Sequence, residues 1–175
     1  MNLWLLRHAA AEDRAASGRD EDRSLTSEGA QRAERVGRGL ATLEPGIELI
    51  LTSPYLRARQ TAKAAARPLG AIKKIRESGA LEPARSPGEI LEELVAEMPA
   101  AVLLVGHQPH LGALLGLLVA GEVGLDIPLK KAALARVSWE GSGAGVLELL
   151  LPAGALDRLA GRRRGSGNAR SPRRG

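Results

Sequence analysis

Asn2-Leu-Trp-Leu-Leu-Arg7-His8, near the amino terminus, decides the fold, because a short apolar run ends directly in two polar side chains. The apolar part predicts a buried strand. Two further runs, Ile47 to Leu51 and Ala101 to Val105, have the same character, and Arg57 and His107 follow them. Ligands of open parallel sheets bind at the carboxyl ends of the strands. Three such ends therefore predict a single shared site.

The rest of the chain alternates between strand and helix patterns, which favours an α/β sandwich with a mostly parallel central sheet. Caps, prolines and apolar periodicity mark the helices, and two apolar runs around a glycine-rich turn indicate a hairpin. In chain order, the further elements expected are a helix from Thr26 or Ser27 to about Leu43, a helix opened by Ser53-Pro54 and running to about Arg67, a short strand from Ile72 to Ile75, a helix opened by the capping box Ser86-Pro87-Gly88-Glu89, a helix from His110 to Ala120, and a hairpin of Ala133 to Trp139 and Gly145 to Leu151.

The charge distribution separates a body from a tail. The chain has 25 basic and 20 acidic residues, and the segment 162–175 holds six Arg and no acid, so residues 1–161 keep 19 basic and 20 acidic groups, a net charge of −1. We therefore expect one domain over residues 1–161 and a basic, disordered tail over 162–175. Without interleaved aromatic side chains, the tail offers no platform for base stacking. We expect no nucleic-acid partner beyond weak contact through this tail.

The composition also indicates where the protein acts. The chain has no Cys, which excludes disulfides and thiolate metal sites and agrees with a cytosolic location. It has neither a signal-peptide pattern nor an apolar run approaching the roughly 20 residues of a membrane span. We expect a cytoplasmic protein that binds no membrane.

The residues at the predicted strand ends suit phosphoryl transfer. Arg7 and Arg57 can donate paired, permanently charged hydrogen bonds to phosphate oxygens. The expected helix start at Ser53-Pro54 would add free amide groups that favour an anion. His8 has a ring nitrogen that can attack phosphorus and form a covalent phosphohistidine. His107 would donate a hydrogen bond to the same phosphate.

Each of these residues also has a purely structural interpretation. A histidine at a strand end is more often a hydrogen-bonded structural residue than a catalyst, and an arginine near a helix start is commonly solvated or ion-paired. The shared spacing favours function, since two of the three histidines follow predicted strands. The third, His110, opens a helix, and we expect it to be structural and to lie at the rim of the site.

Several segments resemble the histidine phosphatase superfamily over about residues 1–152, in both order and spacing. Three correspond to the signature segments of the superfamily: Leu5-Leu6-Arg7-His8-Ala9, Leu51-Thr52-Ser53-Pro54-Tyr55-Leu56-Arg57-Ala58-Arg59-Gln60-Thr61-Ala62 and Val105-Gly106-His107-Gln108-Pro109. Two more, with the short length of the chain, resemble the SixA branch, the phosphohistidine phosphatases: Arg23-Ser24-Leu25-Thr26-Ser27-Glu28-Gly29 and Lys130-Lys131-Ala132-Ala133-Leu134.

The resemblance implies a fold and a set of site residues. The fold is a three-layer α/β/α sandwich with a mostly parallel central sheet, as in phosphoglycerate mutases. His8 is the implied nucleophile, and Arg7, Arg57 and His107 hold the phosphate. Arg23 is a weaker phosphate or substrate contact. Neither a metal nor an organic cofactor is implied.

Two positions depart from the superfamily pattern. Ala9 stands where most members have Gly, a change that a small side chain should tolerate. The general acid of the larger members lies in an inserted segment for which this chain has little room. Glu82, in Ala80-Leu81-Glu82-Pro83, is the best candidate by position. An ordinary loop carboxylate next to a proline is the alternative interpretation.

The function predicted from the sequence is phosphohistidine phosphatase activity on a protein, through a covalent phospho-His8 intermediate. A phosphatase of small phosphate esters is the first alternative, so the substrate is either a phosphohistidine-containing protein or a small phosphorylated molecule. The second alternative function is that of a non-catalytic module that binds phosphoproteins through its arginines. The missing insertion disfavours a mutase, and a pure binding module would not need His8.

Overall fold

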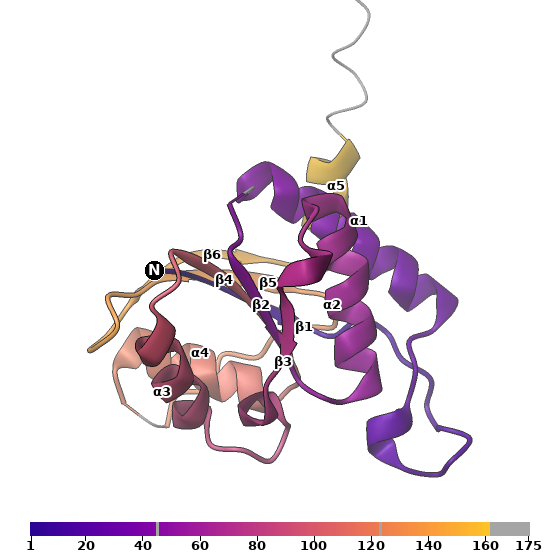
Figure 1. The fold of residues 1–175 in the computed structure, drawn as a ribbon, viewed down its shortest axis with the longest axis horizontal. Helices are drawn as coiled ribbons and strands as arrows, with labels where there is room; N and C mark the ends of the chain where they lie inside the picture. The colour runs from indigo at the N-terminus through magenta and orange to yellow at the C-terminus, as the bar shows by residue number, and fades with distance from the viewer. Residues whose placement is uncertain (45, 123, 162–175) are drawn as a thin grey trace, which may run out of the picture.

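A six-stranded sheet lies at the centre of the computed structural model, which describes residues 1–44, 46–122 and 124–161 (Figure 1). The strand order across the sheet is β3-β2-β4-β1-β5-β6. The strands are β1 (Asn2–Arg7), β2 (Leu49–Thr52), β3 (Ile75–Glu77), β4 (Ala101–Gly106), β5 (Leu134–Ser138) and β6 (Val146–Leu151).

The pairing of the strands confirms a mostly parallel sheet that ends in the expected hairpin. β4 pairs in parallel with both β1 and β2, and β3 pairs in parallel with β2. β5 runs antiparallel to β1, and β6 antiparallel to β5. Arg7 at the end of β1 lies opposite Gly106 at the end of β4, and Thr52 at the end of β2 lies opposite Val105. The carboxyl ends of these three strands therefore share one edge.

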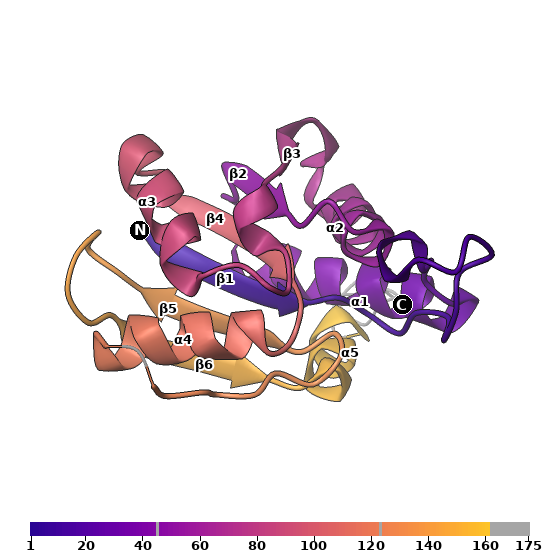
Figure 2. The same cartoon turned by 90° about the horizontal axis from the view of Figure 1, so that it is seen from below.

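Helices cover both faces of the sheet, as Figure 1 and the turned view in Figure 2 show. On one face lie α1 (Ser27–Leu43), α2 (Leu56–Leu69) and α5 (Ala153–Gly161), and on the other α3 (Pro87–Glu97) and α4 (His110–Ala120).

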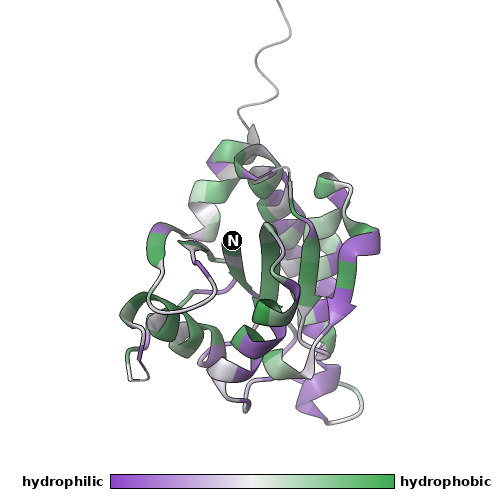
Figure 3. Ribbon diagram, turned by 60° about the vertical axis from the view of Figure 1, so that its left-hand side comes forward, coloured by the Kyte–Doolittle hydropathy of each residue, from purple (hydrophilic) through white to green (hydrophobic). Residues whose placement is uncertain are grey.

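Successive side chains of β1 point alternately into two hydrophobic cores, which hold the sheet and its two layers of helices together. Trp4 and Leu6 join the core beneath α1, α2 and α5, whereas Leu3 and Leu5 join the core beneath α3 and α4. All four side chains are fully buried, because successive side chains of a strand point to opposite faces. Figure 3 shows hydrophobic residues along the central strands and both hydrophobic and hydrophilic residues on the surrounding helices. The predicted three-layer α/β/α fold is confirmed.

Local signals placed several boundaries well. The Thr26 hydroxyl accepts a hydrogen bond from the Gly29 amide at 3.0 Å and caps α1. Ser86 and Glu89 form the expected capping box of α3. α4 spans the expected residues, His110 to Ala120.

Other boundaries were predicted wrongly. Ser53-Pro54 does not open a helix: α2 begins at Leu56, with Tyr55 at the N-cap position. The Ser53 side chain bonds to a histidine instead of capping a helix. α2 also continues past Arg67 to Leu69. Its last turn includes Pro68, and the helix ends at Gly70. β2 begins at Leu49, two residues later than expected.

The third strand and the last helix also differ from expectation. Ile72–Lys74 forms a 3-10 turn, and β3 follows it at Ile75–Glu77. α5 was not expected, because no capping residue marks its start; Leu156 on it is fully buried against the core under α1. The domain boundary after residue 161 stays a prediction, since the basic tail 162–175 lies outside the described residues.

Candidate active site

His8 and His107, which we call the histidine pair, lie side by side where β1 and β4 end. Their ring centroids are 5.1 Å apart, and both side chains are buried. The His8 amide donates to the Gly106 carbonyl at 3.0 Å, which continues the pairing of the two strands by one residue. The Ser53 amide likewise donates to the Val105 carbonyl at 2.9 Å. Three segments far apart in the sequence therefore meet at one point, as expected.

The hydrogen bonding of His8 leaves one ring nitrogen free to react. Its Nδ1 lies 2.8 Å from the Ala9 carbonyl oxygen, which can only accept, so Nδ1 carries the proton and Nε2 carries the lone pair. Burial lowers the pKa of His8 to about 4; the bond to Ala9 opposes this, and the charges of Arg57, Arg7 and Lys131 add to it. The ring is therefore neutral at pH 7, the form that a nucleophilic histidine requires.

His107 is oriented by Ser53. Its Nε2 lies 2.8 Å from the Ser53 hydroxyl oxygen, in a fully buried contact. That hydroxyl also accepts a weak hydrogen bond from the Tyr55 amide at 3.3 Å, which fixes its position. Burial, and next the charge of His8, lower the pKa of His107 to about 3. When the hydroxyl donates to Nε2, the His107 proton lies on Nδ1 and is available to a ligand.

The two arginines approach the histidine pair from different elements. Arg7 ends β1, and its Nη1 donates to the Leu129 carbonyl at 2.8 Å. Arg57 is the second residue of α2, and its guanidinium carbon lies 4.9 Å from the centre of the Tyr55 ring. The Arg57 side chain is almost completely buried.

Three buried nitrogen atoms of these residues have no hydrogen-bond partner within the described part of the chain. They are Arg7 Nε, Arg57 Nε and His107 Nδ1. Buried polar atoms in native proteins nearly always have partners, so unpaired ones indicate a missing ligand, ion or water. The charges of Arg57 and Arg7 both lower the pKa of His8, and the His107 ring lies beside it, so the residues that carry these nitrogens lie near the His8 ring. An anion with several oxygen atoms, such as phosphate, could satisfy them together.

Asp20 accepts hydrogen bonds from the other two guanidinium nitrogens of Arg57, and the sequence did not single it out. It begins the 3-10 turn Asp20–Asp22 in the loop between β1 and α1. Arg57 Nη1 donates to its carbonyl at 2.6 Å, and Arg57 Nη2 to its carboxylate at 2.8 Å. Arg23 Nη1 donates to the other carboxylate oxygen at 2.8 Å. This loop contains many acids, and no local pattern distinguishes the one that pairs with Arg57.

Arg23 therefore reaches the site through Asp20. Its Nε donates to the Glu12 carbonyl at 2.7 Å, and its Nη1 to the Asp20 carboxylate. The structure places Arg23 beside Arg57, in agreement with the expected position near the site. Its contact with a substrate remains a prediction.

Glu82 lies at the same edge of the sheet but apart from these contacts. It follows the 3-10 turn Gly79–Leu81, which comes directly after β3. The Ser78 amide donates to the Thr52 carbonyl at 2.9 Å, so this segment adjoins the end of β2. Within the described residues, the half-buried Glu82 carboxylate makes neither a hydrogen bond nor an ion pair. Its role as a general acid stays a prediction.

His110 and Ala9 are both interior residues. The expected position of His110 at the rim is wrong, because this first residue of α4 is buried. Ala9 is fully buried, and its amide donates to the Thr61 hydroxyl at 3.1 Å. The methyl group that replaces the usual glycine hydrogen is thus accommodated in the core under α2.

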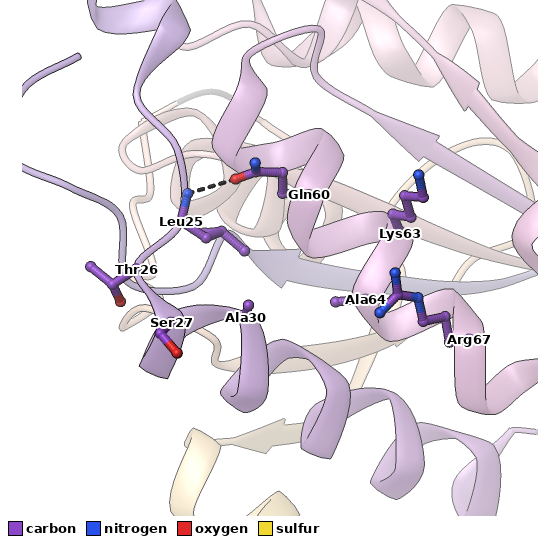
Figure 4. Close-up of a pocket in the computed structure, with 8 residues that line it drawn as sticks. All are labelled: Leu25, Thr26, Ser27, Ala30, Gln60, Lys63, Ala64 and Arg67. Atoms are coloured by element: carbon purple, nitrogen blue, oxygen red, sulfur yellow. Dashed lines mark hydrogen bonds between the residues drawn. The ribbon is translucent and has the colours of Figure 1, made fainter. Parts of the chain in front are cut away.

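A hollow between α1 and α2 lies apart from these residues (Figure 4). The Leu25 amide donates to Gln60 Oε1 at 2.6 Å, which ties the loop before α1 to α2. The hollow is lined by Leu25, Thr26, Ser27, Ala30, Gln60, Lys63, Ala64 and Arg67. It contains none of the residues predicted for phosphate binding, so we do not assign it to the active site.

The residues that the structure describes contain neither a candidate metal site nor a candidate membrane span. None of their His, Cys, Asp and Glu side chains form a group of three or more that could hold a metal ion. No helix in the same residues is both long enough and apolar enough to cross a membrane.

Comparisons with known proteins point to one family. A model of the histidine phosphatase superfamily (branch 1) matches residues 3–82. The phosphohistidine phosphatase SixA of Escherichia coli is 32% identical over 152 residues, which cover 83% of this chain and 89% of that protein. An uncharacterised protein of Picosynechococcus is 41% identical over 138 residues, 77% of this chain and 82% of the relative.

Solved structures agree with these sequence matches. The structure of the protein histidine phosphatase SixA complexed with tungstate has a TM-score of 0.81 and 29% identity, and the match covers 89% of this chain and 99% of that one. A mycobacterial glucosyl-3-phosphoglycerate phosphatase complexed with VO3 has a TM-score of 0.65 over 85% of this chain and 97% of its own. At 19% identity, this second likeness concerns the fold alone.

Proposed function

The chain belongs to the histidine phosphatase superfamily, and on that premise we propose that it is a phosphohistidine phosphatase that acts on a protein through a covalent phospho-His8 intermediate. The observation that carries the proposal is the set of unpaired buried nitrogens on Arg7, Arg57 and His107, three residues near a neutral histidine. Such donors match the charge on the three equatorial oxygens of a transferring phosphoryl group. The neutral ring supplies the nucleophile.

In the first step, the lone pair of His8 Nε2 attacks the phosphorus atom of the substrate. The P–N bond to the substrate imidazole breaks, and its electron pair leaves with the imidazole nitrogen, which takes a proton from solvent. Arg7, Arg57 and His107 donate hydrogen bonds to the phosphoryl oxygens throughout the transfer. The hydrogen bond from His8 Nδ1 to the Ala9 carbonyl supports the positive charge that develops on the ring.

In the second step, water attacks the phosphorus atom of phospho-His8. The P–N bond to His8 breaks, its electron pair returns to Nε2, and the proton released by the water passes to solvent or to a nearby base. Orthophosphate leaves, and the ring is again neutral. The low pKa of the ligand-free His8 favours this return to the neutral form.

The leaving group favours phosphohistidine over an alkyl phosphate as the substrate of this protein. An imidazole departs more readily than an alkoxide, so it depends less on a general acid. The Glu82 carboxylate, the candidate acid, makes no hydrogen bond to the histidine pair within the described residues. The SixA relative, whose name states a phosphohistidine phosphatase, supports the same substrate class.

The short segment between β3 and α3 favours a protein as the substrate. The segment between β3 and α3 spans only residues 78–86 and holds a single 3-10 turn. No inserted domain covers the strand ends there, so a histidine on another protein could reach His8. A phosphatase of small phosphate esters remains the alternative, since an open site also admits small molecules.

The test compares rates on three kinds of substrate. A phosphohistidine peptide, an aryl phosphate and a panel of sugar phosphates and nucleotides are each incubated with the wild-type protein and with His8→Ala. We expect the phosphohistidine peptide to be hydrolysed at least roughly tenfold faster, by kcat/KM, than any sugar phosphate or nucleotide. Faster hydrolysis of one small ester would favour the alternative.

His8→Ala serves as the control, because it removes the attacking nitrogen and leaves the strand intact. Turnover should be lost while the circular dichroism spectrum stays unchanged. Trapping of a phosphorylated protein in the wild type by quenching in denaturant at alkaline pH, where the P–N bond survives, and its absence in His8→Ala, would support the covalent intermediate. Binding of the phosphopeptide without turnover by the wild type would instead favour a non-catalytic binding module.

A further inference from the structure

We propose that Asp20 is an internal competitor of the phosphate: its carboxylate accepts hydrogen bonds from one guanidinium nitrogen of Arg57 and from one of Arg23, and it thereby weakens the binding of substrate and product phosphate. The inference rests on the proposed function in one respect, namely that Arg57 holds the phosphate. It adds a residue that sets the affinity of the site.

The contacts of Arg57 define the competition. Two of its three nitrogen atoms, Nη1 and Nη2, donate to Asp20 at 2.6 and 2.8 Å, and only Nε has no partner among the described residues. An arginine that binds phosphate in the bidentate manner uses two neighbouring nitrogen atoms. A phosphate on the Nη1–Nη2 edge would have to displace Asp20. On the Nε–Nη2 edge it would lie next to the carboxylate, and the two anions would repel each other.

The carboxylate is the more displaceable partner of this ion pair. The Asp20 side chain is 54% exposed, whereas that of Arg57 is only 6% exposed. Asp20 lies in a 3-10 turn that has no buried residue. Arg57 is held by α2 and packs over the Tyr55 ring. When a phosphate arrives, the exposed turn can therefore move while the guanidinium keeps its place.

The charge balance of the site explains why a competitor is useful. A nearly buried guanidinium without any counter-charge is costly, and Asp20 supplies that charge until phosphate binds. A hydrogen bond from Arg23 holds the pKa of Asp20 below its ordinary value, so the carboxylate is charged at neutral pH. Its charge also reaches His107, whose pKa it raises against the stronger effect of burial.

The consequence for turnover concerns the product. Orthophosphate carries much of the charge of the transferring group, so the donors that hold the substrate also hold the product. A carboxylate that returns to Arg57 and Arg23 would promote release of the product. Removal of its charge should therefore tighten phosphate binding, whereas loss of a residue that only positions Arg57 should weaken it.

The experiment measures orthophosphate binding to the full chain. The dissociation constant is determined by calorimetry, and the inhibition constant against an aryl phosphate, for the wild type, Asp20→Asn and Asp20→Ala. We expect both constants to fall by roughly fivefold in the two variants at low ionic strength, the scale of one ion pair whose carboxylate is exposed. The difference should shrink at high salt, because mobile ions screen exposed charges.

Asp22→Asn is the matched control. Asp22 belongs to the same turn, but its carboxylate pairs with Arg19 at 2.9 Å and Ser17 at 2.7 Å rather than with Arg57. This variant removes the same charge from the same loop and should bind orthophosphate like the wild type. Circular dichroism and thermal unfolding check that each variant is folded.

The outcomes separate this inference from the proposed function. Orthophosphate binding that is unchanged or weaker in both Asp20 variants, with an active wild type, would overturn the competitor role and leave the phosphatase in place. Equal tightening in Asp22→Asn would overturn it too, because the effect would then reflect the charge of the loop as a whole. Tighter binding in the Asp20 variants of a wild type that hydrolyses no phosphohistidine would refute the proposed substrate but support the inference.

Discussion

Replacement of Ser53 by alanine tests whether this residue serves the chemistry or only the fold. Its hydroxyl lies 2.8 Å from His107 Nε2, and both side chains are buried. Ser53→Ala removes this bond and leaves a buried ring nitrogen without a partner, which costs about 1–3 kcal/mol. It also allows the His107 ring to adopt either neutral tautomer, so that in part of the molecules Nδ1 lacks the proton that would be donated to phosphate.

The effect on catalysis follows from that free energy. If His107 binds the phosphate more strongly in the transition state than in the ground state, a loss of about 1–3 kcal/mol lowers kcat/KM by roughly tenfold to a hundredfold. The assay is the hydrolysis of an aryl phosphate, together with urea unfolding of the same samples. Ser53→Thr, which keeps the hydroxyl, should retain more activity than Ser53→Ala.

Ser86→Ala provides the comparison. Ser86 caps α3, and its hydroxyl accepts from the Gly88 amide at 3.4 Å in an exposed position. Loss of a cap lowers the free energy of unfolding by about 1 kcal/mol and should leave kcat/KM unchanged. The reasoning would be refuted if Ser53→Ala lost stability to the same extent as Ser86→Ala but kept kcat/KM within about twofold of the wild type. Ser53 would then have only a structural role.

Three further predictions concern the acid, the pH dependence and the packing of the site. Glu82→Gln should slow the hydrolysis of alkyl phosphates by roughly a hundredfold, the scale of losing a general acid, and leave aryl phosphates nearly unaffected; equal losses on both would remove Glu82 from the catalytic residues. Burial lowers the pKa of the histidine pair to about 4 and about 3, whereas the unfolded chain takes up these protons near pH 6.5. The free energy of unfolding, measured in urea, should therefore fall as the pH drops from about 6.5 to 4 and should not fall for this reason above pH 7; a constant value across this interval would contradict the lowered pKa values. Gly29→Ala would place a methyl carbon 2.0 Å from the Ala10 carbonyl oxygen, so we expect the free energy of unfolding to fall by about 1–3 kcal/mol or more. The control is Gly88→Ala, whose methyl carbon would meet only a side-chain oxygen at 3.8 Å. This variant should have the same free energy of unfolding as the wild type.

Residues near each other in the sequence carried most of the correct predictions. The apolar run before Arg7 and His8 predicted β1, and the capping box at Ser86 predicted α3. Such signals are local, because a strand or a cap depends on residues within a few positions. Signals of the same kind misplaced the start of α2, because Ser53 resembles a cap in isolation but bonds to a histidine 54 residues away.

The sequence by itself determined the order of strands and helices as far as β6, and the convergence of His8, Arg57 and His107 beyond the ends of three strands. It could do so because the carboxyl ends of parallel strands share an edge of the sheet. Only the tertiary structure decided which acid pairs with Arg57, which nitrogen of His8 carries the proton, and which donors are left unpaired. The first and the last depend on contacts between segments far apart in the chain, and the proton of His8 depends on the backbone conformation that brings the ring to the carbonyl of the adjacent Ala9. Of the many acids in the loop after β1, only the folded chain distinguishes Asp20, at 2.8 Å from Arg57.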